Sequence, residues 1–381
     1  MALRILVDEA VPLAEAAFAR FGDVRRAPGR AIDGAAVAWA DALVVRSVTR
    51  VDEALLAGSP VRFVGTATIG IDHVDVDFLD RRGIAFASAP GCNARSVAEW
   101  VIAALLEVEA ERGLSWEGRT LGVVGVGHVG SLVARLAPAL GLRVLCCDPP
   151  RAQAEGVTGF VPFEQLLDAA DAITLHVPLV RGGPHPTHHL VGSAELARFV
   201  ERAMLLNSSR GPVVDGPALL RALASETPPL AVLDVWEGEP EPDPALVERA
   251  AFGTPHVAGY SLDGKVEGTR MIARALAHFL GESFEESTVA LEEGPTDLRV
   301  GGSGRAAIRA AVAAAVPLRR DDAALRAACA GPAVGRGQAF DALRRNYPKR
   351  REFGSFRIPG AGIGPAERQV LEDLGFARPG T

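Results

Sequence analysis

The sequence predicts an α/β protein built on mainly parallel sheets, and three observations lead to this prediction. Over the first 90 residues, short apolar runs alternate with stretches whose apolar residues recur at helical spacing. A glycine-rich turn directly follows the apolar run at residues 121–124. After Asp148 the alternation resumes and continues to about residue 259. We therefore expect two α/β units followed by a C-terminal region of different composition.

The first unit is expected to hold four strands before a long helix at residues 93–113. These strands are Leu3–Val7, Ala42–Val45, Val61–Gly65 and Ile84–Ala87, and Val11–Phe21 shows helical spacing. The apolar helix Val266–Leu280 has no strand of its own, so it is expected to pack back on this first unit. The second unit would then be an insertion, which places a cleft between two domains.

The second unit is expected to continue as alternating strands and helices after Asp148. The expected strands are Ala172–His176, Ala203–Leu206, Leu230–Leu233 and a short last strand and loop within Thr254–Gly259; the expected helices are Ala194–Glu201 and Pro217–Ala224. Ligands of open α/β sheets bind outside the carboxyl ends of the strands. The polar residues of this half gather at those ends, so we expect the chemistry there.

The composition changes at about Glu285, where glycine-rich turns begin. An alanine-rich helix, Ala306–Ala315, and a strongly basic stretch at residues 343–352 follow. We interpret residues 290–381 as a small third domain.

Composition and charge exclude several classes of protein. Hydrophobic residues make up 48% and charged residues 23% of the chain, and the net charge of −7 gives no reason to expect nucleic acid or an anionic membrane. No charge-free apolar run reaches the roughly 18 residues that span a bilayer. The first residues indicate a strand and not a signal peptide, so a cytoplasmic location is expected. Four cysteines without a C-x-x-C pair favour buried thiols over a zinc or redox site.

The turn at Gly125, Gly127 and Gly130 has the spacing G-x-G-x-x-G after a strand and before a helix. This pattern is typical of the phosphate-binding turn of a dinucleotide-binding βαβ unit, although a purely structural glycine turn would give the same letters. The first glycine permits the tight turn, the second lets the backbone approach a pyrophosphate, and the third lets helix and strand pack closely. The pyrophosphate would meet free N–H groups at the helix N-terminus, at His128 and Val129.

Asp148 ends the next apolar run, where an acid can accept a hydrogen bond from a ribose 2′-hydroxyl and repel a 2′-phosphate. This position favours NAD over NADP. Arg151 lies close enough in the sequence to leave the choice open.

Three further polar residues follow predicted strand ends: Arg210, Glu239 and His256. Oxidation of a hydroxyl needs a base for its proton, and histidine suits that task near neutral pH. Arginine can hold a substrate carboxylate with two parallel hydrogen bonds, and a carboxylate beside the imidazole stabilises its protonated form. Ordinary loop residues remain the alternative interpretation of these three positions.

The order G-x-G-x-x-G, Asp148, Asn-x-x-Arg-Gly, Asp-Val-x-x-x-Glu-Pro and Pro-His resembles the D-2-hydroxyacid dehydrogenase family over about residues 1–280. The resemblance implies a flavodoxin-like substrate domain with an inserted Rossmann domain that binds NAD. It assigns the catalytic roles to Arg210, Glu239 and His256, and it places Asp234 near the nicotinamide. The implied domains are 1–93 with 258–285 for substrate and 94–257 for NAD.

A narrower resemblance, to a branch of this family that oxidises a small phosphorylated 2-hydroxy acid, covers nearly the whole chain. It rests on Val45-Arg-Ser-Val-Thr, on residues 63–75, on Ala89-Pro-Gly-Cys-Asn-Ala, on His256-Val-Ala-Gly-Tyr-Ser-Leu and on residues 345–352. It implies that residues 290–381 form a small α+β domain that joins a homodimer. It also implies substrate contacts at Ser47, Thr68 and Tyr260.

The resemblance further implies a set of cofactor contacts beyond the glycine turn. They are Asp148, Val177, Ser208, Ser209, Asp234 and Gly259. Val177 stands where relatives often have threonine, so only a backbone contact is carried over there.

Other clusters have alternative interpretations. His185, His188 and His189 could bind a metal, but no carboxylate or cysteine accompanies them at ligand spacing in the sequence, so a surface loop is the expected interpretation and no metal is expected. His73 follows Asp72, which favours local turn bonding over catalysis. The basic stretch 344–351 could be a nucleic-acid patch, a solvated face, or a source of an arginine, Arg350 or Arg351, that reaches a partner subunit's cleft and binds substrate phosphate.

Two rival functions stay open on the sequence alone. One is another D-2-hydroxyacid dehydrogenase, acting on phosphoglycerate, glycerate or lactate. The other is a non-enzymatic NAD-sensing scaffold, since some proteins of this fold are transcriptional corepressors. The complete set of arginine, glutamate and histidine argues against the scaffold.

Overall fold

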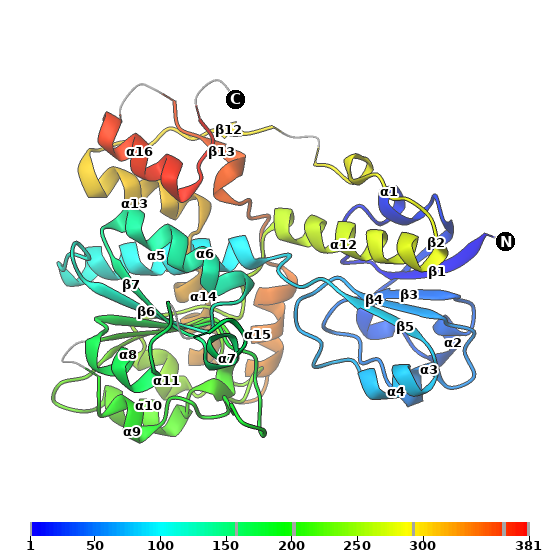
Figure 1. Cartoon of the computed structure of the whole chain (residues 1–381), viewed down its shortest axis with the longest axis horizontal. Coiled ribbons are helices and arrows are strands. Elements are labelled where there is room, and N and C mark those ends of the chain that lie inside the picture. Colours follow the sequence, from blue (N-terminus) through cyan, green and yellow to red (C-terminus); the bar gives the residue numbers. More distant parts are fainter. Residues whose placement is uncertain (1, 157–158, 200–202, 292–293, 360–362, 379–381) are drawn as a thin grey trace. The chain divides into compact units, whose positions relative to one another are not determined.

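The computed structural model describes residues 2–156, 159–199, 203–291, 294–359 and 363–378, and it divides into two compact units. The first unit comprises Met1–Ala94 with Tyr260–Gly294, and the second comprises Arg95–Gly259 with Pro295–Thr381. Figure 1 shows the elements of each unit. Among the described residues, no helix combines the length and apolarity that crossing a membrane requires.

The first unit is a parallel five-stranded sheet in the order β2-β1-β3-β4-β5, which is the flavodoxin-like order. Its strands are β1 (Leu3–Asp8), β2 (Gly22–Ala27), β3 (Ala42–Val45), β4 (Phe63–Thr66) and β5 (Ala85–Ser88). Helices α1 (Ala14–Phe18) and α12 (Leu262–Leu280) pack on one face, and α2 (Gly34–Val37), α3 (Glu53–Leu56) and α4 (Val76–Arg81) pack on the other. The expected packing of α12 on this sheet is therefore present.

The second unit is a parallel six-stranded sheet in the order β11-β10-β9-β8-β6-β7. Its strands are β6 (Thr120–Val124), β7 (Arg143–Cys147), β8 (Ala172–Leu175), β9 (Met204–Asn207), β10 (Leu230–Leu233) and β11 (Phe252–Gly253). The order reverses at β6, which has β7 on one side and β8 on the other. Such a switch point is where doubly wound sheets bind their ligands, and the glycine turn begins at the carboxyl end of β6.

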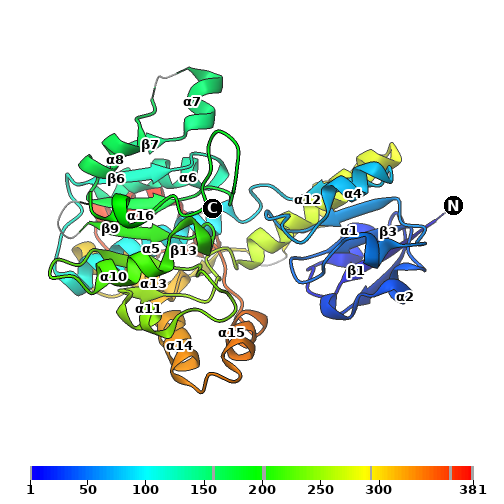
Figure 2. The ribbon, with the colours of Figure 1, turned by 90° about the horizontal axis from the view of Figure 1, so that it is seen from below.

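Helices cover both faces of this second sheet, and the C-terminal region supplies some of them. One face carries α5 (Ala94–Arg112), α6 (His128–Leu136), α13 (Gly304–Ala315) and α16 (Pro365–Leu374); the other carries α8 (Phe163–Ala169), α9 (Ser193–Leu196), α10 (Gly216–Leu223), α11 (Pro244–Arg249), α14 (Leu318–Ala330) and α15 (Arg336–Arg345). Figure 2 shows α14 and α15 side by side. Helix α7 (Pro149–Glu155) follows β7, and the short strands β12 (Thr296–Asp297) and β13 (Phe356–Arg357) pair in parallel.

Ion pairs attach the C-terminal helices to α5. The buried Glu107 accepts from Arg319 of α14 at 2.5 Å, and Glu109 pairs with Arg305 of α13 at 3.0 Å. Residues 295–381 thus share a compact unit and a hydrophobic core with residues 95–259. The assignment of separate functions to three domains stays a prediction.

Two expectations about the strands are wrong. The strand β2 was not predicted, because Gly-Asp-Val-Arg-Arg-Ala has no apolar run and forms an edge strand only by pairing with β1. The last strand lies at Phe252–Gly253, and not within Thr254–Gly259. Residues 254–258 form a loop instead, because the carboxylate of Asp234 accepts from their donors. The expected helix Ala194–Glu201 is shorter, at Ser193–Leu196; residues 200–202 lie outside the described residues.

Candidate active site

The three glycines of the turn after β6 meet three different surroundings. Gly125 has a φ of +82°, which favours glycine, and a Cβ there would lie 2.6 Å from the carbonyl oxygen of His176. A Cβ on Gly130 would lie 2.0 Å from the carbonyl oxygen of Gly125, whereas one on Gly127 would meet nothing within 4 Å. The fold therefore needs the first and third glycines, and the second borders open space. This is the arrangement that a bound pyrophosphate requires.

Asp148 connects the end of β7 to this turn. Its Oδ2 accepts from the N–H of Val126 at 2.8 Å, and its Oδ1 accepts from the N–H of Arg151 at 3.1 Å at the start of α7. Arg151 reaches back to the carbonyl oxygen of Val126 at 2.6 Å and forms two hydrogen bonds with Glu155. Glu155 thus offsets the positive charge of Arg151, which would otherwise attract a 2′-phosphate beside Asp148.

The other predicted cofactor residues follow neighbouring strands of the sheet. Val177 lies two residues beyond β8 and Ser208 directly follows β9. The N–H and hydroxyl of Ser209 both donate to Oδ1 of Asn207, which fixes the loop after β9. The hydroxyl of Ser208 is buried and has no hydrogen-bond partner within the described part of the chain. An unpaired buried hydroxyl in this position fits a group that binds at the end of β9.

Arg210 lies at the end of the same loop. The side-chain amide of Asn207 donates to the carbonyl oxygen of Arg210 at 3.0 Å, so the strand end fixes the arginine backbone. The guanidinium of Arg210 donates to the carbonyl oxygen of Ser209 at 2.8 Å. The strands β9 and β10 are neighbours, so Arg210 and the loop after β10 lie at the same edge of the sheet.

His256 and Glu239 form a direct pair. The Nδ1–H of His256 donates to Oε2 of Glu239 at 2.7 Å, and the other carboxylate oxygen accepts from the N–H of Trp236 at 2.7 Å. Burial by itself would raise the pKa of Glu239, but the charge of the nearby imidazole and these hydrogen bonds lower it below its usual range. Glu239 is therefore ionised near neutral pH. With Nδ1 holding its hydrogen, Nε2 of His256 is the ring nitrogen that can accept a proton.

Asp234 holds the loop that carries His256. Its Oδ1 accepts from the hydroxyl of Thr254 at 2.5 Å and from the N–H of Val257 at 2.7 Å, and its Oδ2 accepts from the N–H of Ala258 at 3.0 Å. Burial raises the pKa of Asp234, and the His256 imidazole and these donors offset only part of the increase. His256 has a φ of +57°, which is uncommon for a residue with a side chain, so the loop conformation depends on such contacts.

The predicted substrate residues lie in the first unit. Ser47 is exposed two residues beyond β3, and the hydroxyl of Thr68 donates to the carbonyl oxygen of Gly70 at 3.0 Å. The ring of Tyr260 has two cations near it: Nζ of Lys265 is 4.7 Å and the guanidinium carbon of Arg46 is 5.9 Å from the ring centroid. Burial, and then the charge of Arg46, lower the pKa of Lys265 to about 8. Sequence reasoning missed Lys265, although it lies only five residues after Tyr260.

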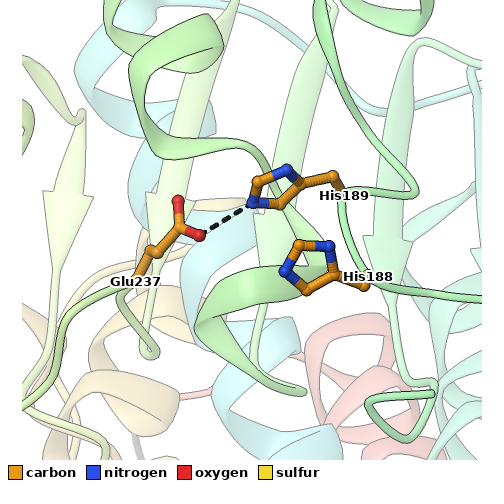
Figure 3. A group of neighbouring side chains, drawn as sticks. All are labelled: His188, His189 and Glu237. Carbon is orange, nitrogen blue, oxygen red and sulfur yellow. Dashed lines mark hydrogen bonds and ion pairs between the residues drawn. The ribbon is translucent and has the colours of Figure 1, made fainter. Parts of the chain in front are cut away.

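The histidines of the 185–189 loop do have a carboxylate nearby in space, contrary to the expectation from sequence spacing. Figure 3 shows Nε2 of His189 against Oε1 of Glu237, 2.8 Å away, with His188 beside them. The other oxygen of Glu237 accepts from the N–H of Gly216 at 3.0 Å. The two imidazoles are stacked, with centroids 4.0 Å apart, and one nitrogen of each ring and a carboxylate oxygen of Glu237 lie within 4.8 Å of one another. The contacts suit a tie between two loops.

Two further histidines have side-chain hydrogen-bond partners. His185 lies 3.2 Å from Oε1 of Gln153 through Nε2. Nε2 of His73 lies 3.0 Å from the hydroxyl of Thr66, at the end of β4, and turn bonding beside Asp72 stays a prediction.

A family model and full-length relatives place the chain in the same family. Residues 94–258 match the family model described as D-isomer specific 2-hydroxyacid dehydrogenase, NAD binding domain, and residues 298–375 match a domain of unknown function, DUF3410. The chain is 48% identical to erythronate-4-phosphate dehydrogenase of Azotobacter vinelandii, covering 98% of this chain and 99% of the relative. It is 49% identical to the enzyme of the same name from Salinibacter ruber, covering 98% of each chain.

Solved structures share the fold of about three quarters of the chain. The TT0316 protein of Thermus thermophilus is 29% identical, with a TM-score of 0.62 over 74% of this chain and 98% of that one. The NAD-dependent formate dehydrogenase of Staphylococcus aureus, solved in complex with NAD, is 25% identical, with a TM-score of 0.59 over 74% of this chain and 97% of that one.

Proposed function

Because the chain belongs to the erythronate-4-phosphate dehydrogenases, within the D-isomer-specific 2-hydroxyacid dehydrogenase family, we propose that it oxidises 4-phospho-D-erythronate at C2. The product is (R)-3-hydroxy-2-oxo-4-phosphobutanoate, in a step of pyridoxal 5′-phosphate (vitamin B6) biosynthesis. The observation that carries this proposal is the pair of His256 and Glu239, 2.7 Å apart, on the unit that carries the glycine turn.

The residues at the ends of the second sheet fit NAD. The turn from Gly125 to Gly130 would hold the pyrophosphate on the N–H groups that open α6, and Asp148 would accept from the adenosine ribose. The backbones of Val177 and Gly259, the loop at Ser208 and Ser209, and Asp234 would bind the nicotinamide half. A bound NAD supplies the acceptor for the hydride that leaves C2.

His256 acts as the base. Its Nε2 takes the proton of the C2 hydroxyl, and the resulting imidazolium is stabilised by the ionised Glu239, which already accepts from Nδ1. In the reverse direction the same nitrogen returns the proton. Glu239 keeps the ring in the tautomer with a free Nε2, because a carboxylate accepts and cannot donate a hydrogen bond. Trp236 fixes the carboxylate from the other side.

Arg210 and the first unit would bind the anionic groups of the substrate. Arg210 would hold the carboxylate and the C2 oxygen, since a guanidinium offers parallel donors to such a pair. Ser47, Thr68 and Tyr260 would contact the rest of the molecule. The two cations beside Tyr260, Arg46 and Lys265, provide positive charge suited to a phosphate, and a non-phosphorylated 2-hydroxy acid would leave that charge unused.

We also propose a cytoplasmic homodimer joined through residues 290–381, as the resemblance to the family implies. All four cysteines are free, which suits a reducing compartment. Light scattering on the purified chain should give twice the mass of one chain. A monomer at working concentrations would contradict this part of the proposal.

The reaction is tested by replacing His256 with Asn. We expect kcat to fall by about 10² or more, the scale of general acid–base catalysis, with NADH affinity unchanged. A variant that retains the wild-type kcat would remove His256 from this role. Absence of turnover on every 2-hydroxy acid, with NADH still bound, would instead favour an NAD-sensing scaffold.

A further inference from the structure

Arg350, in the segment after α15, is buried against the loop that carries His256. Only 5% of this residue is exposed. Its guanidinium donates to the carbonyl oxygen of Ala258 at 2.9 Å, to that of Ser96 at 2.7 Å and to the Ser96 hydroxyl, and its Nη1 lies 3.5 Å from the carbonyl oxygen of Val257. Arg350 is therefore not available to reach a partner subunit's cleft, and the phosphate-binding hypothesis is wrong for this residue.

Asp234 binds the backbone of the same two residues, Val257 and Ala258, from their N–H side. Their N–H groups donate to the Asp234 carboxylate, while their carbonyl oxygens accept from Arg350. The buried carboxylate of Asp234 thus accepts from the N–H groups of this short backbone segment, and the buried guanidinium of Arg350 donates to its carbonyl oxygens. His256 directly precedes this segment and has a left-handed backbone conformation that needs external support.

The contacts around Arg350 continue along the N-terminal turns of α5. The hydroxyl of Ser96 donates to the carbonyl oxygen of Ala258 at 2.8 Å, and Oε1 of Glu99 accepts from the N–H of Phe353 at 2.9 Å. Arg95 pairs with Glu99 at 2.7 Å. The segment is thus fixed to α5 by Arg350 itself and by Phe353, three residues further on, which gives the guanidinium a defined position from which to hold the loop.

We propose that Arg350 is a positioning residue for His256, and that the C-terminal region therefore acts within its own subunit to fix the geometry of the base. This inference rests on the proposed role of His256. Without Arg350, the carbonyl oxygens of Val257 and Ala258 lose their charged donor, and the loop can leave the conformation that presents the imidazole to Glu239. This role requires no contact between Arg350 and the substrate or the cofactor.

The test compares Arg350→Gln, Arg350→Lys and, as a matched control, Lys349→Gln, which removes an exposed neighbouring cation. The first-turnover rate is followed by NADH absorbance with 4-phospho-D-erythronate, together with the substrate KM and the NADH Kd. We expect Arg350→Gln to lower the rate by about 10- to 100-fold, the scale of a misplaced catalytic group, and to leave KM and Kd within about twofold. Arg350→Lys should recover part of the loss, and the control should match the wild type.

A double-mutant cycle separates positioning from general damage. In the background of His256→Asn, the Arg350→Gln substitution should cost less than about twofold, because its effect passes through the imidazole. Equal losses in the two backgrounds, or a full rate in Arg350→Gln, would overturn the proposal. If Arg350→Gln does not fold, Arg350→Lys and Ser96→Ala, which keep the buried charge, are compared in the same cycle.

A readout independent of turnover distinguishes this inference from the proposed function. The ring signals of isotope-labelled histidine are recorded for the wild type and the variants, with the His256 signal assigned by His256→Asn. Arg350→Gln should shift and broaden the His256 signal, and Lys349→Gln should not. An unchanged His256 signal in Arg350→Gln would overturn the positioning role, whereas an inactive wild type with the expected shifts would contradict only the proposed reaction.

Discussion

Replacing Gly127 or Gly130 with alanine should affect different properties, although the two positions are three residues apart in the same turn. We expect Gly130→Ala to lower the thermal stability and Gly127→Ala to weaken NADH binding. A Cβ on Gly130 would lie 2.0 Å from the carbonyl oxygen of Gly125, and Cβ atoms essentially never come closer than 3.0 Å to such a neighbour. The backbone must therefore move by about 1 Å (3.0 − 2.0). A Cβ on Gly127 would meet no protein atom within 4 Å.

These distances set the expected magnitudes. A clash with backbone belongs to the upper part of the range of about 1–3 kcal/mol that overpacking costs, and the preference for alanine over glycine in a helix offsets about 1 kcal/mol of it. A net loss of about 1–2 kcal/mol lowers the Tm of a unit of this size by roughly 2–8 °C. Gly127→Ala should lower the Tm less than Gly130→Ala does, because a Cβ added at Gly127 meets no protein atom within 4 Å.

Gly127→Ala should instead weaken the binding of NADH. Its methyl group would occupy the space that the pyrophosphate needs, so we expect Kd to rise by at least about tenfold, which corresponds to about 1.4 kcal/mol. Fluorescence titration with NADH and a thermal melt of each variant measure the two effects. Wild-type NADH affinity in Gly127→Ala would refute the assignment of the turn to the dinucleotide.

Three other outcomes follow from the same contacts. Glu239→Gln should lower kcat by about 10²-fold with unchanged NADH affinity, because a neutral amide no longer stabilises the imidazolium of His256. A full kcat in steady-state assays would contradict the catalytic role of the pair of Glu239 and His256. Lys265 loses its charge as the pH rises through about 8, so the KM for the phosphorylated substrate should rise over this range. Lys265→Arg should remove the rise. A pH-independent KM in the wild type would exclude Lys265 from the phosphate site. Burial raises the pKa of Glu99 to about 8 despite the opposing charge of Arg95. Between about pH 4.5 and 8 the folded state therefore binds more protons than the unfolded state, and the stability of the fold falls as the pH rises. Thermal melts of Glu99→Gln over this range should be flatter than those of the wild type, and parallel curves would contradict the assignment.

Much of the fold was predictable from local pattern. The strands at residues 42–45 and 230–233 were predicted with the bounds that the structure has, because buried parallel strands are short uninterrupted apolar runs. The edge strand at 22–27 was not, since its charged residues gain an extended conformation only from pairing with β1. The loop after residue 253 was mistaken for a strand because the acceptor for its N–H groups, Asp234, lies far back in the sequence.

The candidate site was predictable only where residues follow strand ends. Glu239 and His256 could be proposed as a pair because the order of parallel strands brings their loops to one edge of the sheet. Arg350 and Glu237 could not, since their partners are reached through packing and not through spacing. In the sequence Arg350 is one cation of a basic stretch, and only its burial distinguishes it from Lys349.

The central claim is tested most directly by comparing 4-phospho-D-erythronate with 3-phosphoglycerate as substrates of the purified chain. NADH formation, with removal of the oxo acid, gives kcat/KM for each acid in the wild type and in His256→Asn. We expect a clear preference for 4-phospho-D-erythronate, and a loss of about 10² or more on that substrate in His256→Asn. An equal or higher kcat/KM on 3-phosphoglycerate would contradict the proposed substrate, and undiminished turnover in His256→Asn would contradict the mechanism.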